Sequence, residues 1–363
     1  MQNNNIVGNT ISQTILAGYD RVINEGTYRP SRNGGCTSIF DTTFEITNPR
    51  SRHLYLEGRK SNIFALIAET FWVMAGDDRV NPYLSFFLPR APDYSDDGVT
   101  WHAAYGPRFY RFNQHLDALD AFIEDGLYTR RSFIQISMPD LDNKKAIEAR
   151  YGVGHKAKDI SCNREIHFYV GADNKFSAKT VQRSGDMIFG TGSINPFEFS
   201  FLHELMYNEV RKVYPDLELG AYRWHVTNAH LYDWSKSQAD AAYNNSMNYV
   251  NYNENNEPLI APDIILWKSF FTNLVRLYTE VIESEDEQVE SLCKNLVYDL
   301  GHAFISYNVP MEGNLLWTYA KLVAHYIGAK KNIQPVVLVD VGINKEFSDS
   351  ILKSSFRKFE VIK

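Results

Sequence analysis

The chain has 363 residues, of which 44% are hydrophobic and 14% aromatic, and its formal net charge is -7 at pH 7. This length supports a buried core in one large domain or two ordinary ones, and the acidic balance argues against general nucleic-acid binding, which needs massed Lys and Arg. Cys36, Cys162 and Cys293 are too far apart for a disulfide framework or a metal-binding cysteine pair. No apolar run reaches transmembrane length, and the first residues do not resemble a secretory signal. We therefore expect a soluble, cytoplasmic protein that does not bind membranes.

The first part of the chain mixes helical and strand-like segments. The apolar stretch 14–23 predicts a helix, and a glycine-containing loop then runs into a strand within 29–46. Residues 62–76 have helical apolar spacing that stops at a glycine. The segment 130–140 predicts a strand, and the polar stretch 141–159 is interpreted as an excursion.

A hairpin is predicted next, and it places a cysteine in an unusual position. The runs EIHFYV and FSAKTV alternate as strands do, and GADNK between them is typical of a turn. Pairing the strands about Asp173 puts Cys162 opposite Ser184, with Arg183 beside it. A lone cysteine at the start of a strand is more often a buried apolar residue, but a neighbouring cation lowers the pKa of a thiol. The open end of the hairpin is therefore a candidate site.

After the hairpin, residues 194–213 predict a helix with Asn195 as its N-cap and Pro196 in the first turn, and 222–234 predict a strand. Strands and long helices without a regular βαβ order indicate an α+β fold. We divide the chain into a first domain (1–235), an Asn-rich linker or loop (236–262) and a mainly helical C-terminal region (263–363). In that last region, an amphipathic helix ends at a C-capping Gly328.

Eight motifs, taken in order over about residues 30–235, resemble the thymidylate synthase family, which includes phage pyrimidine hydroxymethylases. CNREIHFYV resembles the segment with the family's catalytic cysteine, and QRSGDMIFG resembles its phosphate- and folate-binding segment. The helix that follows carries the expected asparagine after one extra residue. The remaining motifs are SRNGGCTSIF, IAETFWVMAGD, AAYG, TRRSFIQIS and NAHLYDW. The resemblance implies a mixed sheet flanked by helices over residues 1–235, with the C-terminal helical region as an addition.

The resemblance also implies roles for individual residues. The catalytic residues would be Cys162, Glu69, Asn195 and Tyr105. The nucleotide would be bound by Arg32, Arg130, Arg131, Arg183, Ser184, His230 and Tyr232, and the pterin of the co-substrate 5,10-methylenetetrahydrofolate by Asp186. In the family, the arginines at 130 and 131 act in the neighbouring subunit, which implies a homodimer; no metal is implied.

Simpler interpretations of four of these residues also exist. The asparagine at 195 could serve only as a helix N-cap. The glutamate at 69 interrupts an apolar helical pattern, where a carboxylate must be exposed, paired or functional. His230 and Tyr232 share one face of a strand and could be a satisfied polar pair.

The implied chemistry begins with addition of a thiolate to C6 of uracil, because C5 is otherwise a poor nucleophile. An amide at position 195 suits uracil, since it can both donate to O4 and accept from N3–H, whereas a carboxyl group would suit cytosine better. Four arginines would bind a phosphate dianion through charge-assisted bonds. Glu69 would organise water and proton transfer at O4 and C5. The substrate is then dUMP, although the sequence leaves a ribose nucleotide open.

Three departures from the synthase pattern bear on the last step. Asn163 stands where synthases usually carry histidine, the loop before Tyr105 has no tryptophans that align with the synthase shield, and the segment FRKFEVIK differs from the apolar synthase tail. Each change would admit water to the reactive methylene. We therefore favour hydroxymethylation of dUMP, in the host cytoplasm if the protein is phage-encoded. The alternatives are a thymidylate synthase that makes dTMP and an inactive family member that binds nucleotide or protein.

Overall fold

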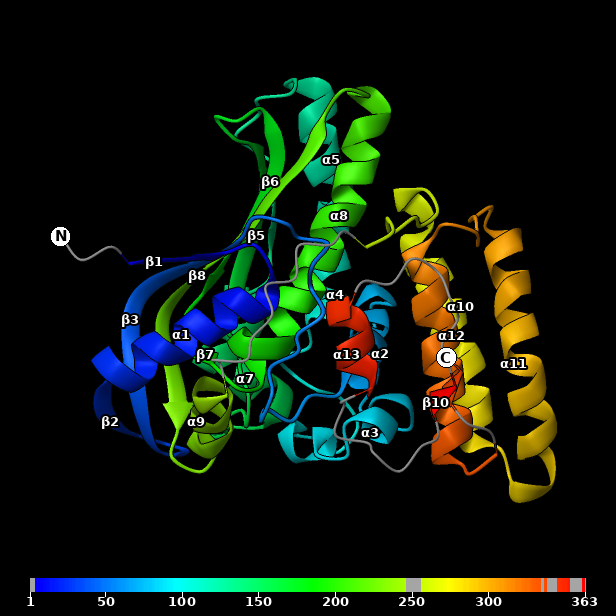
Figure 1. Ribbon diagram of the computed structural model, residues 1–363, viewed down its shortest axis with the longest axis horizontal. Coiled ribbons are helices and arrows are strands. Elements are labelled where there is room, and N and C mark those ends of the chain that lie inside the picture. Colours follow the sequence, from blue (N-terminus) through cyan, green and yellow to red (C-terminus); the bar gives the residue numbers. More distant parts are fainter. Residues whose placement is uncertain (1–3, 246–255, 334–335, 338–344, 353–360, 363) are drawn as a thin grey trace.

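A computed structural model describes residues 4–245, 256–333, 336–337, 345–352 and 361–362. Its centre is a mixed eight-stranded sheet in the order β1-β3-β8-β6-β5-β4, in which β2 also pairs with β3 and β7 with β8 (Figure 1). The strands are β1 (Asn5–Gly8), β2 (Thr27–Ser31), β3 (Gly34–Ile46), β4 (Phe133–Gln135), β5 (Asn163–Val170), β6 (Lys175–Gln182), β7 (Gly185–Asp186) and β8 (Glu218–Tyr232). A separate parallel pair joins β9 (Val336–Val337) to β10 (Val361–Ile362).

Helices flank this sheet and continue beyond it into a C-terminal group (Figure 1). Within the first two-thirds of the chain they are α1 (Ile11–Glu25), α2 (Ile63–Met74), α3 (Tyr83–Phe87), α4 (Tyr105–Tyr110), α5 (Gln114–Glu124), α6 (Pro139–Asp142), α7 (Lys144–Tyr151), α8 (Asn195–Val213) and α9 (Lys236–Asn244). The later ones are α10 (Trp267–Glu283), α11 (Asp286–Ser306), α12 (Leu315–Lys330) and α13 (Lys345–Leu352). The predicted α+β class, with an added C-terminal helical region, is confirmed.

One face of the sheet is covered by helices, and the other is open within the chain. Paired residues form a row across the strands on the open face: Phe133, His167, Lys179, Arg223 and Glu45. All of them are partly or largely exposed, whereas their neighbours along each strand are mostly buried. This alternation is typical of a sheet with a core on one side only.

The C-terminal helices pack directly on the first part of the chain. Both α10 and α12 contact α2, and the hydroxyl of Thr272 donates to the backbone oxygen of Ala75 at 3.2 Å. A hydrogen bond of 2.6 Å also joins His53 Nε2 to the hydroxyl of Tyr319. The hydrophobic core is continuous from the sheet into these helices.

Three expectations for this part of the chain need comment. The expected linker opens with a regular helix, α9, while residues 246–255 lie outside the described part of the chain. Gly328 was predicted to end its helix, but α12 continues to Lys330 because the glycine is buried inside the helical group, where packing outweighs its low helix propensity. Most of the FRKFEVIK segment also lies outside the described residues.

Helix α8 is anchored by a buried ion pair. Arg52 and Glu204 are both fully buried, and their closest atoms, Nη2 and Oε2, are 2.5 Å apart. Arg50 adds a second contact to the same carboxylate at 2.7 Å, and the backbone N–H of Leu259 a third at 3.2 Å. These bonds fix α8 against the loop before α2 and the start of the C-terminal region.

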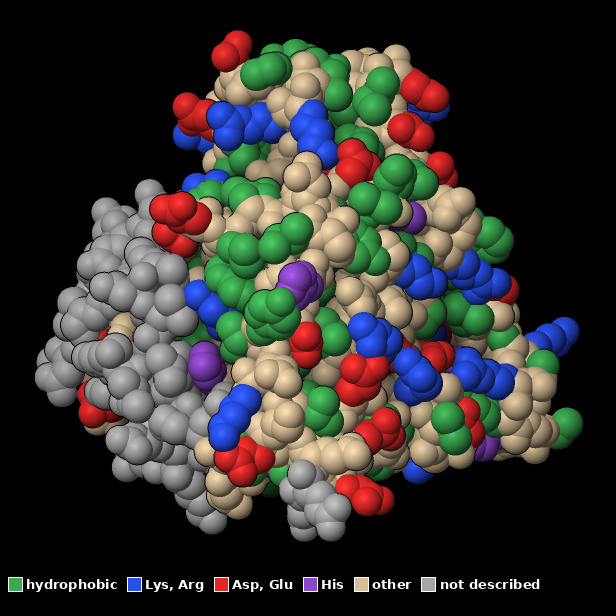
Figure 2. Space-filling model, turned by 90° about the vertical axis from the view of Figure 1, so that its right-hand side faces the viewer, with side chains coloured by type: hydrophobic (Ala, Val, Ile, Leu, Met, Phe, Trp, Pro, Cys, Tyr) green, Lys and Arg blue, Asp and Glu red, His purple; other side chains and the backbone are tan. Residues whose placement is uncertain are grey.

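The surface carries both signs of charge. On the face drawn in Figure 2, Lys and Arg side chains lie among Asp and Glu, so the described residues drawn there form no large patch of one sign. None of the described helices combines the length and hydropathy needed to cross a membrane.

Candidate active site

The predicted hairpin forms, with one shift beside the cysteine. Strands β5 and β6 pair in the predicted register from Glu165 to Val170, but a bulge precedes Glu165. The N–H of Arg183 therefore donates to the backbone oxygen of Cys162 at 3.0 Å. Cys162 lies opposite Arg183, so the prediction that it faces Ser184 is wrong by one residue. Bulges of this kind often redirect a side chain next to a site.

Three arginines from separate segments line one cavity of about 600 Å³ in front of this bulge: Arg32, Arg164 and Arg183. Arg183 donates to the backbone oxygens of Ile160 at 2.6 Å and Ser161 at 3.1 Å. Arg32 donates to the backbone oxygen of Lys158 at 3.1 Å. Convergent guanidinium groups favour a doubly charged anion such as a phosphate. The sequence analysis missed Arg164, which follows the cysteine and enters the cavity because of the bulge.

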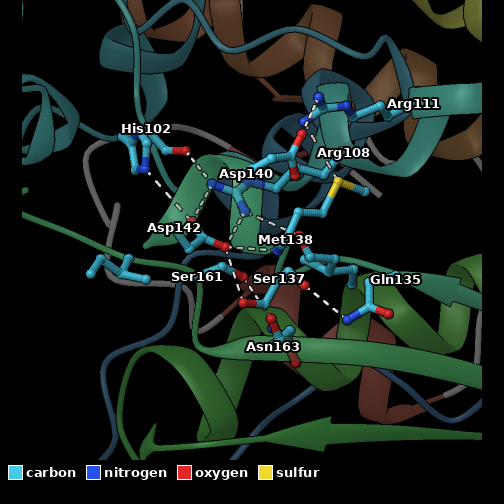
Figure 3. Close-up of polar contacts among 12 residues, drawn as sticks. His102, Arg108, Arg111, Gln135, Ser137, Met138, Asp140, Asp142, Ser161 and Asn163 are labelled. Carbon is cyan, nitrogen blue, oxygen red and sulfur yellow. Dashed lines mark hydrogen bonds and ion pairs between the residues drawn. The ribbon is translucent and has the colours of Figure 1, made fainter. Parts of the chain in front are cut away.

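The opposite wall of the cavity carries a carboxylate that is already neutralised. Asp142 accepts two hydrogen bonds from Arg108, at 2.7 and 2.8 Å, and one each from Ser137 Oγ and the Met138 N–H (Figure 3). Burial by itself would raise the pKa of Asp142, but the bonds from His102 and Arg108 hold it well below its usual value. The carboxylate of Asp142 is therefore balanced by Arg108, and within the described residues the cavity arginines form no ion pair with it.

Cys162 is partly exposed, and its neighbours Ile160, Arg164 and Arg183 line the cavity. The Ser161 hydroxyl donates to the backbone oxygen of Asn163 at 2.6 Å (Figure 3). Burial raises the pKa of the Cys162 thiol, Arg183 opposes this, and Asp159 adds to it. Arg183 lowers the pKa of the thiol, as the sequence predicts, but in the free protein desolvation outweighs this cation.

Tyr105 lies near both Cys162 and Asn163. Gln182 Nε2 donates to the side-chain oxygen of Asn163 at 2.8 Å, while Thr191 donates to the side-chain oxygen of Gln182. These two bonds fix the orientation of the Asn163 amide. Burial and the nearby Cys162 raise the pKa of Tyr105, and the side chain of Asn163 lowers it. The thiol and the phenol therefore share one environment.

Asn195 begins α8 without capping it. Residues Gly190–Ile194 form a π-helical turn, which accommodates the extra residue noted in the sequence, and the asparagine follows with helical angles, φ -60° and ψ -50°. The interpretation of Asn195 as the N-cap is therefore wrong; Ile194 holds that position. The Asn195 side chain is 5% exposed, and its amide has no hydrogen-bond partner among the described residues. An amide without a protein partner at such a position is available to a ligand or water.

Two carboxyl groups lie near this asparagine. Burial raises the pKa of Glu69, on α2, to about 7. Glu198, on α8, is 4% exposed, and burial and the nearby Glu69 raise its pKa well above the usual value. Neither carboxylate forms an ion pair within the described residues. The sequence analysis missed Glu198, although a glutamate one turn after Asn195 in an otherwise apolar run was a usable signal.

His230 and Tyr232 lie at the end of β8, near the cavity arginines. His230 pairs with Asp186 of β7; burial lowers the pKa of the histidine, and Asp186 opposes this. Asp186 accepts a hydrogen bond from the Ile188 N–H at 2.7 Å, and burial raises its pKa. Tyr232 lines the cavity, and its hydroxyl is 3.4 Å from Asn33 Nδ2.

The remaining predicted residues divide into two groups. Ser184 lies directly after Arg183 and is partly buried. Arg130 and Arg131 are exposed on their own chain and do not line the cavity. Both ends of the Arg131 guanidinium bond to Asp125 instead. The site within one chain therefore contains two of the four predicted arginines and one that was not predicted.

The loop before Tyr105 contains aromatic groups that the sequence analysis did not align. Tyr94 stacks on Trp101, with ring centroids 5.2 Å apart and an angle of 8° between the rings. The indole N–H of Trp101 donates to Asp159 Oδ2 at 3.0 Å. Burial raises the pKa of Asp159, while Trp101 and the cavity arginines Arg183 and Arg32 lower it. Asp159 escaped prediction because it ends the polar excursion 141–159, which has no regular pattern.

Comparisons with known proteins identify the family of this chain. The sequence model of the family "Thymidylate synthase" matches residues 14–290. The deoxyuridylate hydroxymethyltransferase of Delftia phage PhiW-14 is 42% identical over 372 aligned positions, which cover 99% of this chain and 98% of that protein. Deoxyuridylate hydroxymethyltransferases of Pseudomonas phage M6 and Bacillus phage SP01 are 31% and 30% identical, each over 58% of this chain and 56% and 54% of their own. The chain therefore belongs to the thymidylate synthase family of one-carbon transferases.

Proposed function

We propose that this protein transfers a one-carbon unit from 5,10-methylenetetrahydrofolate to C5 of dUMP and releases 5-hydroxymethyl-dUMP. The observation that carries the proposal is the unpartnered amide of Asn195 at the start of α8, one turn before Glu198; Glu198 and Cys162 both lie near Tyr105. Such an amide matches O4 and N3–H of uracil. The names of the three phage relatives support the same substrate and product.

Each group in the site would have a distinct task. Arg32 and Arg183 would bind the phosphate, with His230 and Tyr232 at the sugar. The Cys162 thiolate would add to C6, which makes C5 nucleophilic. A phosphate dianion beside Arg183 does not favour that thiolate, so proton removal needs a base, and Glu69 with a pKa of about 7 suits proton transfer near neutral pH.

The residues around Asp186 fit a folate ring system. This carboxyl group is partly buried and accepts bonds from backbone N–H groups. Next to it, Phe189 stacks on Trp234 with centroids 5.7 Å apart, and both rings are about half exposed. Asp186 would hold the polar edge of the pterin, and the aromatic pair would cover an apolar part of the co-substrate, which supplies the one-carbon unit.

Thymidylate synthesis is the second candidate, and one observation favours it. The rings of Tyr94 and Trp101 stack, and Trp101 bonds to Asp159, which lies near Cys162. In that position the rings could shield the methylene from water. Liquid chromatography with mass spectrometry of the nucleotide product separates the two reactions. The proposal expects 5-hydroxymethyl-dUMP, and dTMP would favour the synthase. An inactive family member would return unchanged dUMP.

We also propose that the site is completed by a second subunit. The open sheet face carries exposed apolar groups such as Phe133, which is 44% exposed, and Arg130 lies just before that strand. Pairing of two such faces would bury them and bring arginines to the partner's cavity. Mixing Arg130→Ala subunits with Cys162→Ala subunits should restore part of the activity, since one site of each heterodimer is intact. No recovery after verified exchange would contradict the shared site.

We place the reaction in the cytoplasm, because Cys36, Cys162 and Cys293 are all free thiols and a reducing compartment keeps them so. If the protein is phage-encoded, as its named relatives are, this is the cytoplasm of the host.

A further inference from the structure

The segment before Cys162 is fixed by the arginines that it surrounds. Backbone oxygens of Lys158, Ile160 and Ser161 accept hydrogen bonds from Arg32 or Arg183. Asp159 therefore lies between residues whose backbone oxygens are held by hydrogen bonds, Lys158 on one side and Ile160 on the other. The backbone of Asp159 therefore has a defined position.

Trp101 orients the carboxyl group of Asp159. The indole N–H donates to Oδ2 at 3.0 Å. The indole itself is held by stacking on Tyr94 and by contact with Trp72, at centroid distances of 5.2 and 6.3 Å. Within the described part of the chain, Trp101 is the one side-chain donor to this carboxyl group. The second oxygen, Oδ1, thus has no side-chain partner there.

Asp159 lies close to the Cys162 thiol and the Tyr105 phenol, and its negative charge affects both. It raises the pKa of both the Cys162 thiol and the Tyr105 phenol, so it opposes formation of the nucleophile. Burial raises the pKa of Asp159 overall, and Trp101, Arg183 and Arg32 oppose this rise by favouring the carboxylate. Glu69 has no comparable cation, since burial is the cause of its shift. Of the two carboxyl groups, Asp159 is better suited to remain ionised and accept a proton.

We propose, on the basis of the proposed function, that the Asp159 carboxylate is the general base for the water that captures the methylene group, and that Trp101 positions it. The water oxygen forms a bond to the methylene carbon while its proton moves to the carboxylate. The electron pair of the exocyclic double bond shifts into the ring. It then re-forms the C5–C6 double bond as the Cys162 sulfur leaves C6, and Asp159 releases its proton to solvent. No oxidant or reductant is needed.

Single-turnover measurements with dUMP tritiated at C5 test this role. Tritium release reports the steps that precede water capture, and mass spectrometry of 5-hydroxymethyl-dUMP reports the capture itself. For Asp159→Asn, tritium release should stay within about threefold of the wild-type rate, while product formation falls about 10²-fold or more, the usual contribution of a general base. Added 2-mercaptoethanol, whose thiolate needs no base, should convert the trapped intermediate into a 5-thioether nucleotide.

Further variants separate a chemical role from a structural one. Trp101→Phe retains the stacking ring but loses the N–H, so it should slow product formation several-fold without slowing tritium release. Asp159→Glu should recover part of the capture rate. Asp173→Asn, in the exposed hairpin turn, is the control and should match the wild type.

Two results would overturn the inference. One is an Asp159→Asn protein that hydroxymethylates dUMP at the wild-type rate. The other is a parallel loss of tritium release and product in a variant whose thermal unfolding is unchanged. A wild-type protein that makes dTMP would overturn the proposed function itself, which is a separate outcome.

Discussion

Of the three buried glutamates on helix α8, Glu198 near its start and Glu204 near its middle have opposite surroundings. Burial would raise the pKa of Glu204, but Arg52 and Arg50 lower it below the usual value. Glu198 has no cation, and burial and Glu69 raise its pKa well above the usual value. One helix thus holds a fully paired carboxylate and an unpaired carboxyl group.

The difference separates what holds this fold together from what is available for chemistry. Breaking a buried ion pair leaves an uncompensated charge and is costly. A buried polar group without a protein partner is also costly, and groups with strongly shifted pKa values cluster at functional sites. The unpaired groups lie together, on α2, the start of α8 and the edge of the hairpin, whereas the ion pair lies further along α8.

The largest effect is expected from Cys162→Ala, which should abolish turnover because the covalent step is lost. The free energy of unfolding should change by less than about 1 kcal/mol, since the substitution removes a single sulfur atom from a partly exposed residue. Product formation measures the loss of turnover, and urea unfolding measures the change in stability. On the wild type, 5-fluoro-dUMP with folate should trap a covalent adduct. Cys293→Ala, buried in α11, is the matched control and should remain active. Any turnover by Cys162→Ala would sink the mechanism.

The two glutamates can be compared by the same substitution. Glu204→Gln should lower the free energy of unfolding by about 3–5 kcal/mol, because it leaves Arg52 buried and unpaired. Glu198→Gln should change it by less than about 1 kcal/mol, because a neutral carboxyl group is replaced by a neutral amide. Urea unfolding at neutral pH measures both. Equal losses of unfolding free energy would contradict the distinction between a paired carboxylate at Glu204 and an unpaired carboxyl group at Glu198.

Asn195→Asp should shift the base preference from dUMP towards dCMP by about an order of magnitude or more. Cytosine reverses the hydrogen-bonding polarity at both positions that the amide matches, and each mismatch costs roughly 1–3 kcal/mol. The ratio of kcat/KM for the two nucleotides is the measurement. Asn195→Ala is the control, which should weaken both substrates without reversing the order. A wild-type protein that already prefers dCMP would contradict base reading by this residue.

The last effect concerns the pH dependence of stability. Folding raises the pKa of Glu69 from 4.5 to about 7, so its contribution to stability is complete below about 4.5 and is lost as the pH rises through about 7. Glu69→Gln removes this dependence. The free energy of unfolding of the variant should therefore rise relative to the wild type across that range. Urea unfolding at several pH values tests this, and a constant difference would refute it.

Much of the fold could be predicted because its signals are local. Strand alternation and the turn at GADNK specify the hairpin register from Glu165 onwards, and apolar spacing indicates α2, α8 and α10. The shift at Cys162 could not be predicted, because the bulge depends on Ile136 and Ser137, whose N–H groups both bond to the backbone oxygen of Arg164. Similarly, the residue count before Asn195 indicates an insertion but not the π-helical turn that absorbs it.

The candidate site was predictable where motifs carry it and not where it depends on tertiary contacts. Cys162 and Arg183 follow from adjacent strands. Arg164, Asp159 and Glu198 were missed, since a charged residue in a loop, bulge or helix gains meaning only when its neighbours are known. The indole that binds Asp159 lies in another loop, and no sequence spacing links the two.

The proposed reaction transfers a one-carbon unit from 5,10-methylenetetrahydrofolate to dUMP held by Cys162 and ends with capture of that unit by water. The most direct measurement is a single reaction of purified protein with dUMP and 5,10-methylenetetrahydrofolate, followed by mass spectrometry of the nucleotide and by absorbance for dihydrofolate. The account predicts 5-hydroxymethyl-dUMP and unoxidised tetrahydrofolate, without dihydrofolate. Formation of dTMP with an equal amount of dihydrofolate would contradict it.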